Sequence, residues 1–273
     1  MRLFISLVLL VSLASSPAWA ESCRTAVLLG YWPPTNEMLR PFSTSPRQNP
    51  KGWQGRNWRN LGYNVHAYFP EFPPDGDPTN DQIGEPGSVG AKGSDFQVDY
   101  QDTSRDFWRI MAVHKPAILI TNSRGGEIGW ELEAVEGGHG TGDQSAELDW
   151  IADRYGQVHL PEQSSVDRRS WAAITTYRAG ERLASSLPLA EILRRVQRLD
   201  LVSSAIDENT SGNYLSGFMG LHGLAYAKDN THVQAAGHIH VGRSVSVEDA
   251  QLLLEVSLQT TLERHPPNCE AQD

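Results

Sequence analysis

Residues 201–241, LVSSAIDENTSGNYLSGFMGLHGLAYAKDNTHVQAAGHIHV, decide the fold that the sequence predicts. The segment opens with a short apolar run, 201–206, which is typical of a buried strand. A glycine-rich turn leads into a helix with apolar side chains on one side, and a second strand-like run, 232–241, closes the unit. This succession of strand, helix and strand indicates an α/β fold in which the helix packs against a sheet.

The same alternation continues on both sides of this segment. Further strands are predicted at 25–32, 64–72, 116–121 and 127–134, and further helices at 102–114, 187–199 and from Ser246 to about Leu262. Together these elements predict a three-layer α/β/α sandwich with a mostly parallel central sheet. Sites in such folds form at the carboxyl ends of the strands, which is where we expect the functional residues.

The first twenty residues, MRLFISLVLLVSLASSPAWA, have the pattern of an export signal. Arg2 supplies the positive start, the apolar run is too short to span a bilayer, and Ala-Trp-Ala supplies a cleavage site. We therefore predict a signal peptide at 1–20 and a single domain at 21–273, secreted or periplasmic and free of the membrane after signal removal. In an exported protein, Cys23 and Cys269 favour one disulfide, with two free thiols as the alternative.

The charge balance argues against some classes of partner. The chain carries 23 Lys and Arg against 33 Asp and Glu, a formal net charge of −10, and shows no basic cluster. This argues against nucleic acid or an anionic membrane as a partner. We expect no cofactor, and the sequence leaves a homo-oligomer open.

Two polar segments interrupt the predicted elements. Residues 73–95 are rich in Pro, Gly and Asp, and residues 137–170 are polar and Gly-rich with little periodicity. Loops of this length are often functional. We interpret 137–170 as an insertion or lid.

Ser216 lies where the glycine-rich turn meets the predicted helix. If the helix begins there, backbone N–H groups near Ser216 and Gly217 are unpaired and could stabilise an oxyanion. Gly217, which has no Cβ, would let a substrate approach closely. A serine hydroxyl needs a base to act as a nucleophile, and the alternative is a serine that caps the helix, which is common at helix starts.

His238 and His240 are two residues apart on a predicted strand, so both point to one face. One imidazole could serve as a general base at neutral pH. A His-x-His pair is also a metal pattern, which Glu131 or His222 would have to complete. No HExxH or CxxC motif supports a metal, so none is predicted, and His222 on the apolar helix face fits a core histidine best.

Glu131 lies in the alternating segment 127–134, EIGWELEA, whose odd positions carry the carboxylates. A carboxylate among apolar neighbours needs a partner or a site, and Glu131 could orient the histidine as the third member of a triad. Glu127 and Glu133 on the same face are its rivals. Arg124, on a Gly-flanked turn, could bind a carboxylate or phosphate or could be a solvated loop residue.

Three blocks, in this order, resemble segments of the pyroglutamyl peptidases, also called pyrrolidone carboxyl peptidases. EIGWELEAV is similar to the segment around the family's catalytic glutamate, and Glu131 falls on that position. LPLAEILRRVQ followed by AIDENTSGNYLSGF is similar to the family's helix, strand and nucleophile turn, and GHIHVG places His240 on the catalytic histidine. The N-terminal VLLGYWPP echoes the loop that lines the family's pyroglutamyl pocket.

The resemblance implies an open α/β/α sandwich and an omega-peptidase type of hydrolase that removes N-terminal pyroglutamate or a related cyclic amide from a peptide or small amide. Ser216 would attack the carbonyl, His240 would move the proton, and Glu131 would hold His240. The serine stands where the family has cysteine, whose reactive anion forms far more readily. The alternative is a catalytically silent relative that binds peptide ends or small amides. The implied substrate contacts are Tyr31, Trp32, Tyr214 and Gly217.

Overall fold

A computed structural model describes residues 24–71, 96, 98, 100–138, 181–209 and 214–267. The predicted signal peptide, both cysteines and nearly all of the two polar segments lie outside the described residues. Within the described part of the chain, no helix is long and apolar enough to cross a membrane.

Six strands form the central sheet, in the order β2-β1-β3-β8-β4-β7. Their bounds are β1 Arg24–Gly30, β2 Tyr63–Tyr68, β3 Ile118–Arg124, β4 Trp130–Glu133, β7 Ser204–Asp207 and β8 Ala235–Val241. Strands β2, β1, β3 and β8 run parallel, whereas β4 is antiparallel to β8 and parallel to β7. The mostly parallel sheet that the sequence predicts is therefore confirmed.

The reversed direction of β4 has a simple cause. Only residues 125–129 separate β3 from β4, and a parallel return needs a connection of roughly a dozen residues or more. The chain therefore turns over β8 and comes back antiparallel. A second, two-stranded sheet pairs β5 (Val135–Gly137) with β6 (Arg182–Ala184), and the sequence does not predict it.

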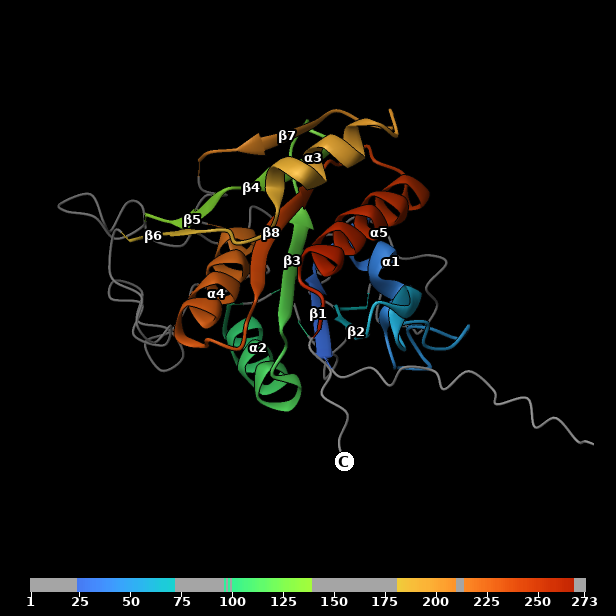
Figure 1. Cartoon of the computed structure of the whole chain (residues 1–273), viewed down its shortest axis with the longest axis vertical. Coiled ribbons are helices and arrows are strands. Elements are labelled where there is room, and N and C mark those ends of the chain that lie inside the picture. Colours follow the sequence, from blue (N-terminus) through green and yellow to red (C-terminus); the bar gives the residue numbers. More distant parts are fainter. Residues whose placement is uncertain are drawn as a thin grey trace, which may run out of the picture.

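Helices cover both faces of the central sheet, as Figure 1 shows. One face carries α2 (Tyr100–His114) and α4 (Leu215–Asp229), and the other carries α1 (Thr35–Leu39), α3 (Leu189–Gln197) and α5 (Val247–Arg264). Two 3₁₀ turns, η1 (Arg40–Phe42) and η2 (Trp58–Asn60), lie between β1 and β2. This confirms the predicted three-layer α/β/α sandwich.

Each face buries its own apolar cluster because successive strand residues point to opposite sides. Trp130 and Leu132 of β4 lie in the cluster under α3 and α5. Glu131 and Glu133 therefore point to the α4 side, as the alternation in the sequence predicts. The predicted start of α5 at Ser246 is also confirmed, because Ser246 is its N-cap and Ser246 Oγ accepts a 3.0 Å hydrogen bond from the Asp249 N–H.

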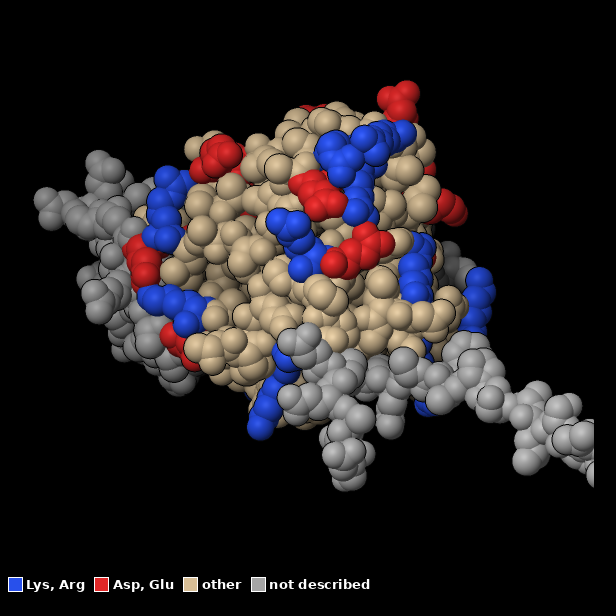
Figure 2. Space-filling model, viewed as in Figure 1, with Lys and Arg blue, Asp and Glu red and all other residues tan. Residues whose placement is uncertain are grey.

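Charged side chains of both signs are interspersed on the face that carries α3 and α5, as Figure 2 shows. Arg195 forms ion pairs of 2.6 Å with both Glu191 and Glu263. Arg59 pairs with Glu255 at 2.6 Å. These pairs join α3 to α5 and η2 to α5 at the surface, where solvent screens them.

Candidate functional site

Polar side chains gather on the α4 face of the sheet, where β3, β8 and β4 lie side by side. Their register explains the grouping: Ser123 is paired with His240, Glu131 with His240, and Glu133 with His238. Residues paired directly across two strands point to the same face. All five side chains therefore lie on the same face of the sheet, in two adjacent rows beneath α4.

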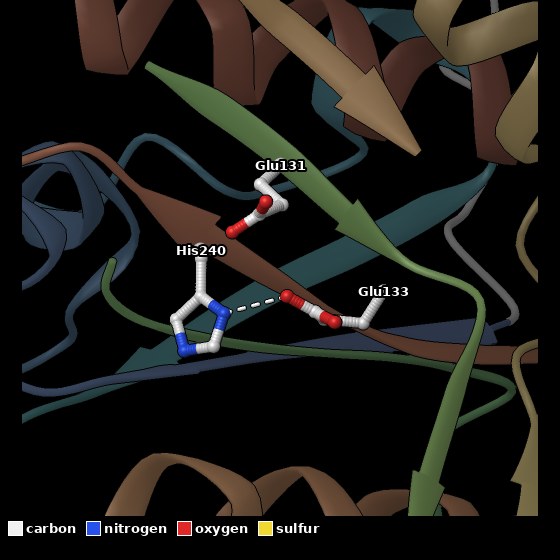
Figure 3. A group of neighbouring side chains, drawn as sticks. All are labelled: Glu131, Glu133 and His240. Atoms are coloured by element: carbon white, nitrogen blue, oxygen red, sulfur yellow. Dashed lines mark hydrogen bonds and ion pairs between the residues drawn. The ribbon is translucent and has the colours of Figure 1, made fainter. Parts of the chain in front are cut away.

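His240 is held by a buried carboxylate. Its Nδ1 lies 2.6 Å from Glu133 Oε1, as Figure 3 shows, and Glu133 is 1% exposed and His240 7% exposed. Burial raises the pKa of the Glu133 carboxyl, and the hydrogen bond with His240 offsets part of that shift. An Nδ1–H that donates to Glu133 leaves Nε2 as the nitrogen with a free lone pair.

Glu131, which the sequence analysis expects to hold His240, lies directly opposite it but does not make the bond. The bond goes to Glu133, one of the two rivals, because a diagonal neighbour starts about 7–8 Å away and gives a glutamate room to reach back. Burial raises the pKa of the half-buried Glu131 carboxyl. One ligand atom from each of Glu131, Glu133 and His240 lies within 4.8 Å of the others, a spacing that a bound ion could use.

His238 has different surroundings from His240. Thr121 Oγ1 lies 2.7 Å from its Nδ1 and Ser123 Oγ 2.9 Å from its Nε2. Burial, helped by the neighbouring His240, holds the pKa of His238 well below its ordinary value. Both nitrogens of a neutral ring are thus occupied, which leaves neither for the His238–His240 metal pair that the sequence analysis considers.

His222 is the core histidine that the sequence predicts. Its ring is fully buried, with Nδ1 2.8 Å from the Phe218 carbonyl oxygen and Nε2 3.1 Å from Ser104 Oγ. Burial lowers the pKa of His222 to about 4. The ring therefore serves packing between α2 and α4 rather than the site.

Ser216 lies in the first turn of α4 and is half-buried. The first intrahelical bond runs from the Phe218 N–H to the Tyr214 carbonyl, so the N–H groups of Ser216 and Gly217 have no acceptor within the helix. No hydrogen bond joins Ser216 to His240, both of which are described residues. The predicted pairing is therefore not formed in this structure.

The helix nevertheless brings Ser216 to the level of His240. A Cβ on Gly220 would lie 3.1 Å from His238 Cγ, so α4 crosses β8 there. Because α4 ends five residues before β8 begins, it runs antiparallel to the strand. Four helix residues rise about 6 Å and two strand residues about 6.6 Å. The step from Gly220 back to Ser216 thus matches the step from His238 to His240.

The four expected substrate contacts fall in different places. Tyr31 is 1% exposed, its hydroxyl bonds Thr103 Oγ1, and it belongs to the core between α2 and the sheet. Trp32 is half-buried and has a left-handed backbone with φ of 59°, which is unusual for a bulky residue. Tyr214, at the start of α4, is 49% exposed, whereas Gly217 is buried. Tyr214 and Trp32 therefore remain accessible to a ligand, and Tyr31 does not.

Sequence reasoning missed the residues that support the two histidines. Thr121 and Ser123 lie far from His238 in the chain, and no local pattern signals their contact. Gly125 leaves room for His240, because a Cβ on Gly125 would lie 2.8 Å from His240 Cβ. In the sequence, this role is indicated only by the Gly125-Gly126 pair after β3. Arg124 is paired with Val241 and points to the opposite face, so it does not belong to this site.

Solved structures of a known peptidase are similar to this chain. The pyrrolidone carboxyl peptidase of Pyrococcus furiosus, solved together with its cysteine-free mutant, aligns with a TM-score of 0.58 and 13% identity over 88% of this chain and 99% of that one. Another mutant of the same peptidase aligns with a TM-score of 0.59 and 15% identity over the same shares. The chain has the pyrrolidone carboxyl peptidase fold.

The likeness to pyrrolidone carboxyl peptidase extends over most of both chains. At identities of 13–15%, however, it shows the fold alone. No family model matches the sequence. No curated protein matches it either. The chemistry of the site therefore depends on the residues that this chain places there.

Proposed function

We propose that the chain is an exported hydrolase that cleaves an amide bond with Ser216 as nucleophile, His240 as general base and acid, and Glu133 as the carboxylate that holds His240. The observation that carries the proposal is the 2.6 Å hydrogen bond between His240 Nδ1 and the buried Glu133. A buried histidine with a buried carboxylate on one nitrogen is the arrangement that a serine nucleophile requires. The leader at 1–20 supports export.

The proposed reaction begins with proton transfer from the Ser216 hydroxyl to His240 Nε2. The serine oxygen forms a bond to the substrate carbonyl carbon, and the N–H groups of Ser216 and Gly217 stabilise the oxyanion at the positive end of α4. His240 then gives its proton to the leaving amine as the C–N bond breaks. Water, activated by the same imidazole, releases the acyl group and regenerates Ser216.

The two glutamates have separate parts in this proposal. Glu133 fixes the ring and carries the charge opposite the imidazolium that forms during the reaction. Glu131, which the sequence analysis expects in that part, lies beside the pair and adds a second negative charge near the imidazolium. Its removal should therefore weaken catalysis without misplacing the ring.

The proposed substrate is an N-terminal pyroglutamyl peptide or a related cyclic amide. The support is the shared fold with proteins named pyrrolidone carboxyl peptidase, together with the exposed Tyr214 at the start of α4 and the half-buried Trp32 after β1. Aromatic side chains at such positions can pack against a small ring.

The test is hydrolysis of a chromogenic pyroglutamyl amide by the purified mature chain. Wild type should release the chromophore, and Ser216→Ala should lower kcat by about 10⁴-fold or more. Ser244→Ala is the matched control, because Ser244 is exposed and makes no hydrogen bond among the described residues. Equal activity of wild type and Ser216→Ala would contradict the proposal.

A second candidate function is binding without catalysis. It is favoured by one observation, that Ser216 and His240 are not hydrogen-bonded in the structure. In that case wild type would bind a pyroglutamyl peptide without turnover, and Ser216→Cys would become active because a thiol ionises more readily. Calorimetric titration with a pyroglutamyl peptide, alongside the chromogenic assay, separates the two candidates.

A further inference from the structure

Glu131, Glu133 and His240 converge from two adjacent strands. One ligand atom from each lies within 4.8 Å of the other two. Figure 3 shows both carboxylates directed toward the imidazole from β4, with His240 on β8. Ligand atoms around one zinc ion sit about 3–4 Å apart, so small side-chain rotations would close the set. Because both strands belong to the central sheet, the backbone of the cluster is rigid.

The charges of this cluster are not balanced. Asp207 is paired with Glu133 in the register of β7 with β4, which brings a third carboxylate beside the two glutamates. Among the described residues, no Lys or Arg forms an ion pair with Glu131 or Glu133. Partly buried negative charge of this kind calls for a cation.

One oxygen of the cluster also lacks a partner. Glu133 Oε1 is bonded to His240, but Glu133 Oε2 is buried and has no hydrogen bond within the described part of the chain. Glu133 as a whole is 1% exposed, so bulk water does not reach it. A buried carboxylate oxygen without a partner is an independent indication that a ligand belongs beside it.

We propose that Glu131, Glu133 and His240 form a binding site for one divalent transition-metal ion, with Zn²⁺ as the best match to two carboxylates and one imidazole. Zinc binds histidine nitrogen and carboxylate oxygen, and three protein ligands leave a fourth position for water. The ion takes the lone pair of Nδ1 on a neutral His240 ring, and the ring proton then resides on Nε2, so no net proton is released from the imidazole.

The site does not depend on the proposed hydrolase, but it bears on it. An ion at His240 Nδ1 breaks the bond to Glu133 that holds the ring as a base. Metal binding and hydrolysis through Ser216 therefore exclude each other, and Zn²⁺ acts as a reversible inhibitor of the proposed reaction. His238, whose nitrogens are occupied by Thr121 and Ser123, takes no part.

The test is calorimetric titration of the chelator-treated mature chain with Zn²⁺, without any substrate. Wild type should bind one ion, and Glu131→Gln should weaken binding at least tenfold, because it removes a ligand while leaving the Glu133–His240 bond intact. Glu127→Gln is the matched control: the same chemical change on an exposed residue of the preceding turn. Its affinity should equal that of wild type.

A second variant, His240→Gln, keeps the proposal testable where Glu131→Gln does not fold, and circular dichroism reports the fold of each. The His240→Gln variant should also bind Zn²⁺ at least tenfold more weakly than wild type. Absence of saturable Zn²⁺ binding to wild type, or equal binding by wild type and both variants, would overturn the site. Since the heat of metal binding is read without substrate, this result is independent of whether the chain hydrolyses amides.

Discussion

Two histidines on the same face of β8, only two residues apart, lie in contrasting surroundings. Hydroxyl groups of Thr121 and Ser123 occupy both nitrogens of His238, whereas a carboxylate occupies one nitrogen of His240. Their rings touch edge to face with centroids 4.8 Å apart. The difference teaches that the hydrogen-bonding partners of a buried imidazole decide which of its nitrogens stays available: two hydroxyl groups take both nitrogens of His238, whereas the carboxylate takes one nitrogen of His240.

The largest expected effect lies on the His240 side of this comparison. Glu133→Gln should lower kcat for a pyroglutamyl amide by about 10⁴-fold, because the amide no longer stabilises the imidazolium or the correct tautomer. Glu131→Gln should cost far less, about tenfold. Steady-state kinetics of the two variants measure this difference in kcat. A larger loss of kcat in Glu131→Gln than in Glu133→Gln would show that Glu131 is the carboxylate that orients His240.

The next effect concerns acid stability and the core histidines. Burial lowers the pKa of His222 to about 4, while the unfolded chain takes up its proton near 6.5. A lowered folded-state pKa means that the stability is present above pH 6.5 and is lost as the pH falls toward 4, by up to about 3 kcal/mol for this group. Burial, with help from His114, lowers the pKa of His66 to about 4, which acts in the same direction.

Urea unfolding at pH 7, 6 and 5 checks this expectation. The free energy of unfolding should decline across that series, and His222→Phe should decline less steeply than wild type. A flat profile would show that these rings are not buried as neutral groups.

A smaller effect is expected on the His238 side. Thr121→Val removes the hydroxyl beside His238 Nδ1 but keeps the shape of the side chain, so the free energy of unfolding should fall by about 1–3 kcal/mol. Activity should change only a few-fold, since His238 does not take part in the chemistry. Denaturant unfolding and kinetics on the same variant separate these outcomes; a loss of activity near that of Glu133→Gln would place His238 in the reaction.

The smallest effect is expected for a carboxylate that pairs with a cation at the surface. Glu263 bonds Arg195 between α5 and α3, where both side chains are about one third exposed. Glu263→Gln should change the free energy of unfolding by less than about 1 kcal/mol and leave kinetics unchanged. Comparing Glu133→Gln with Glu263→Gln thus measures how much the burial of a carboxylate beside His240 contributes to kcat and to the free energy of unfolding.

The sequence predicts the layers well because burial leaves a periodic trace. Trp130 and Leu132 alternate with Glu131 and Glu133, and the structure places the two pairs on opposite faces as expected. Strands β5 and β6, at three residues each, are too short to show any period. The direction of β4 depends on the length of its connection, which composition does not reveal.

The site is less visible in the sequence than the fold. Alternation puts Glu131 and Glu133 on one face but cannot decide between them, because the choice depends on the diagonal reach across to His240. Tyr31, expected in a pocket, is instead buried with its hydroxyl on Thr103. The reactivity of Ser216 depends on proton transfer to His240, which leaves no periodic pattern in the sequence.

The central claim is that Ser216 is a nucleophile activated by His240, whose ring is oriented by its hydrogen bond to Glu133. Incubation with a fluorophosphonate probe, followed by peptide mass spectrometry, tests it most directly, because such probes form a stable adduct only with an activated serine. The account predicts one adduct, on Ser216, formed at least a hundredfold more slowly in Glu133→Gln. An unlabelled Ser216, or labelling as fast in Glu133→Gln as in wild type, would contradict it.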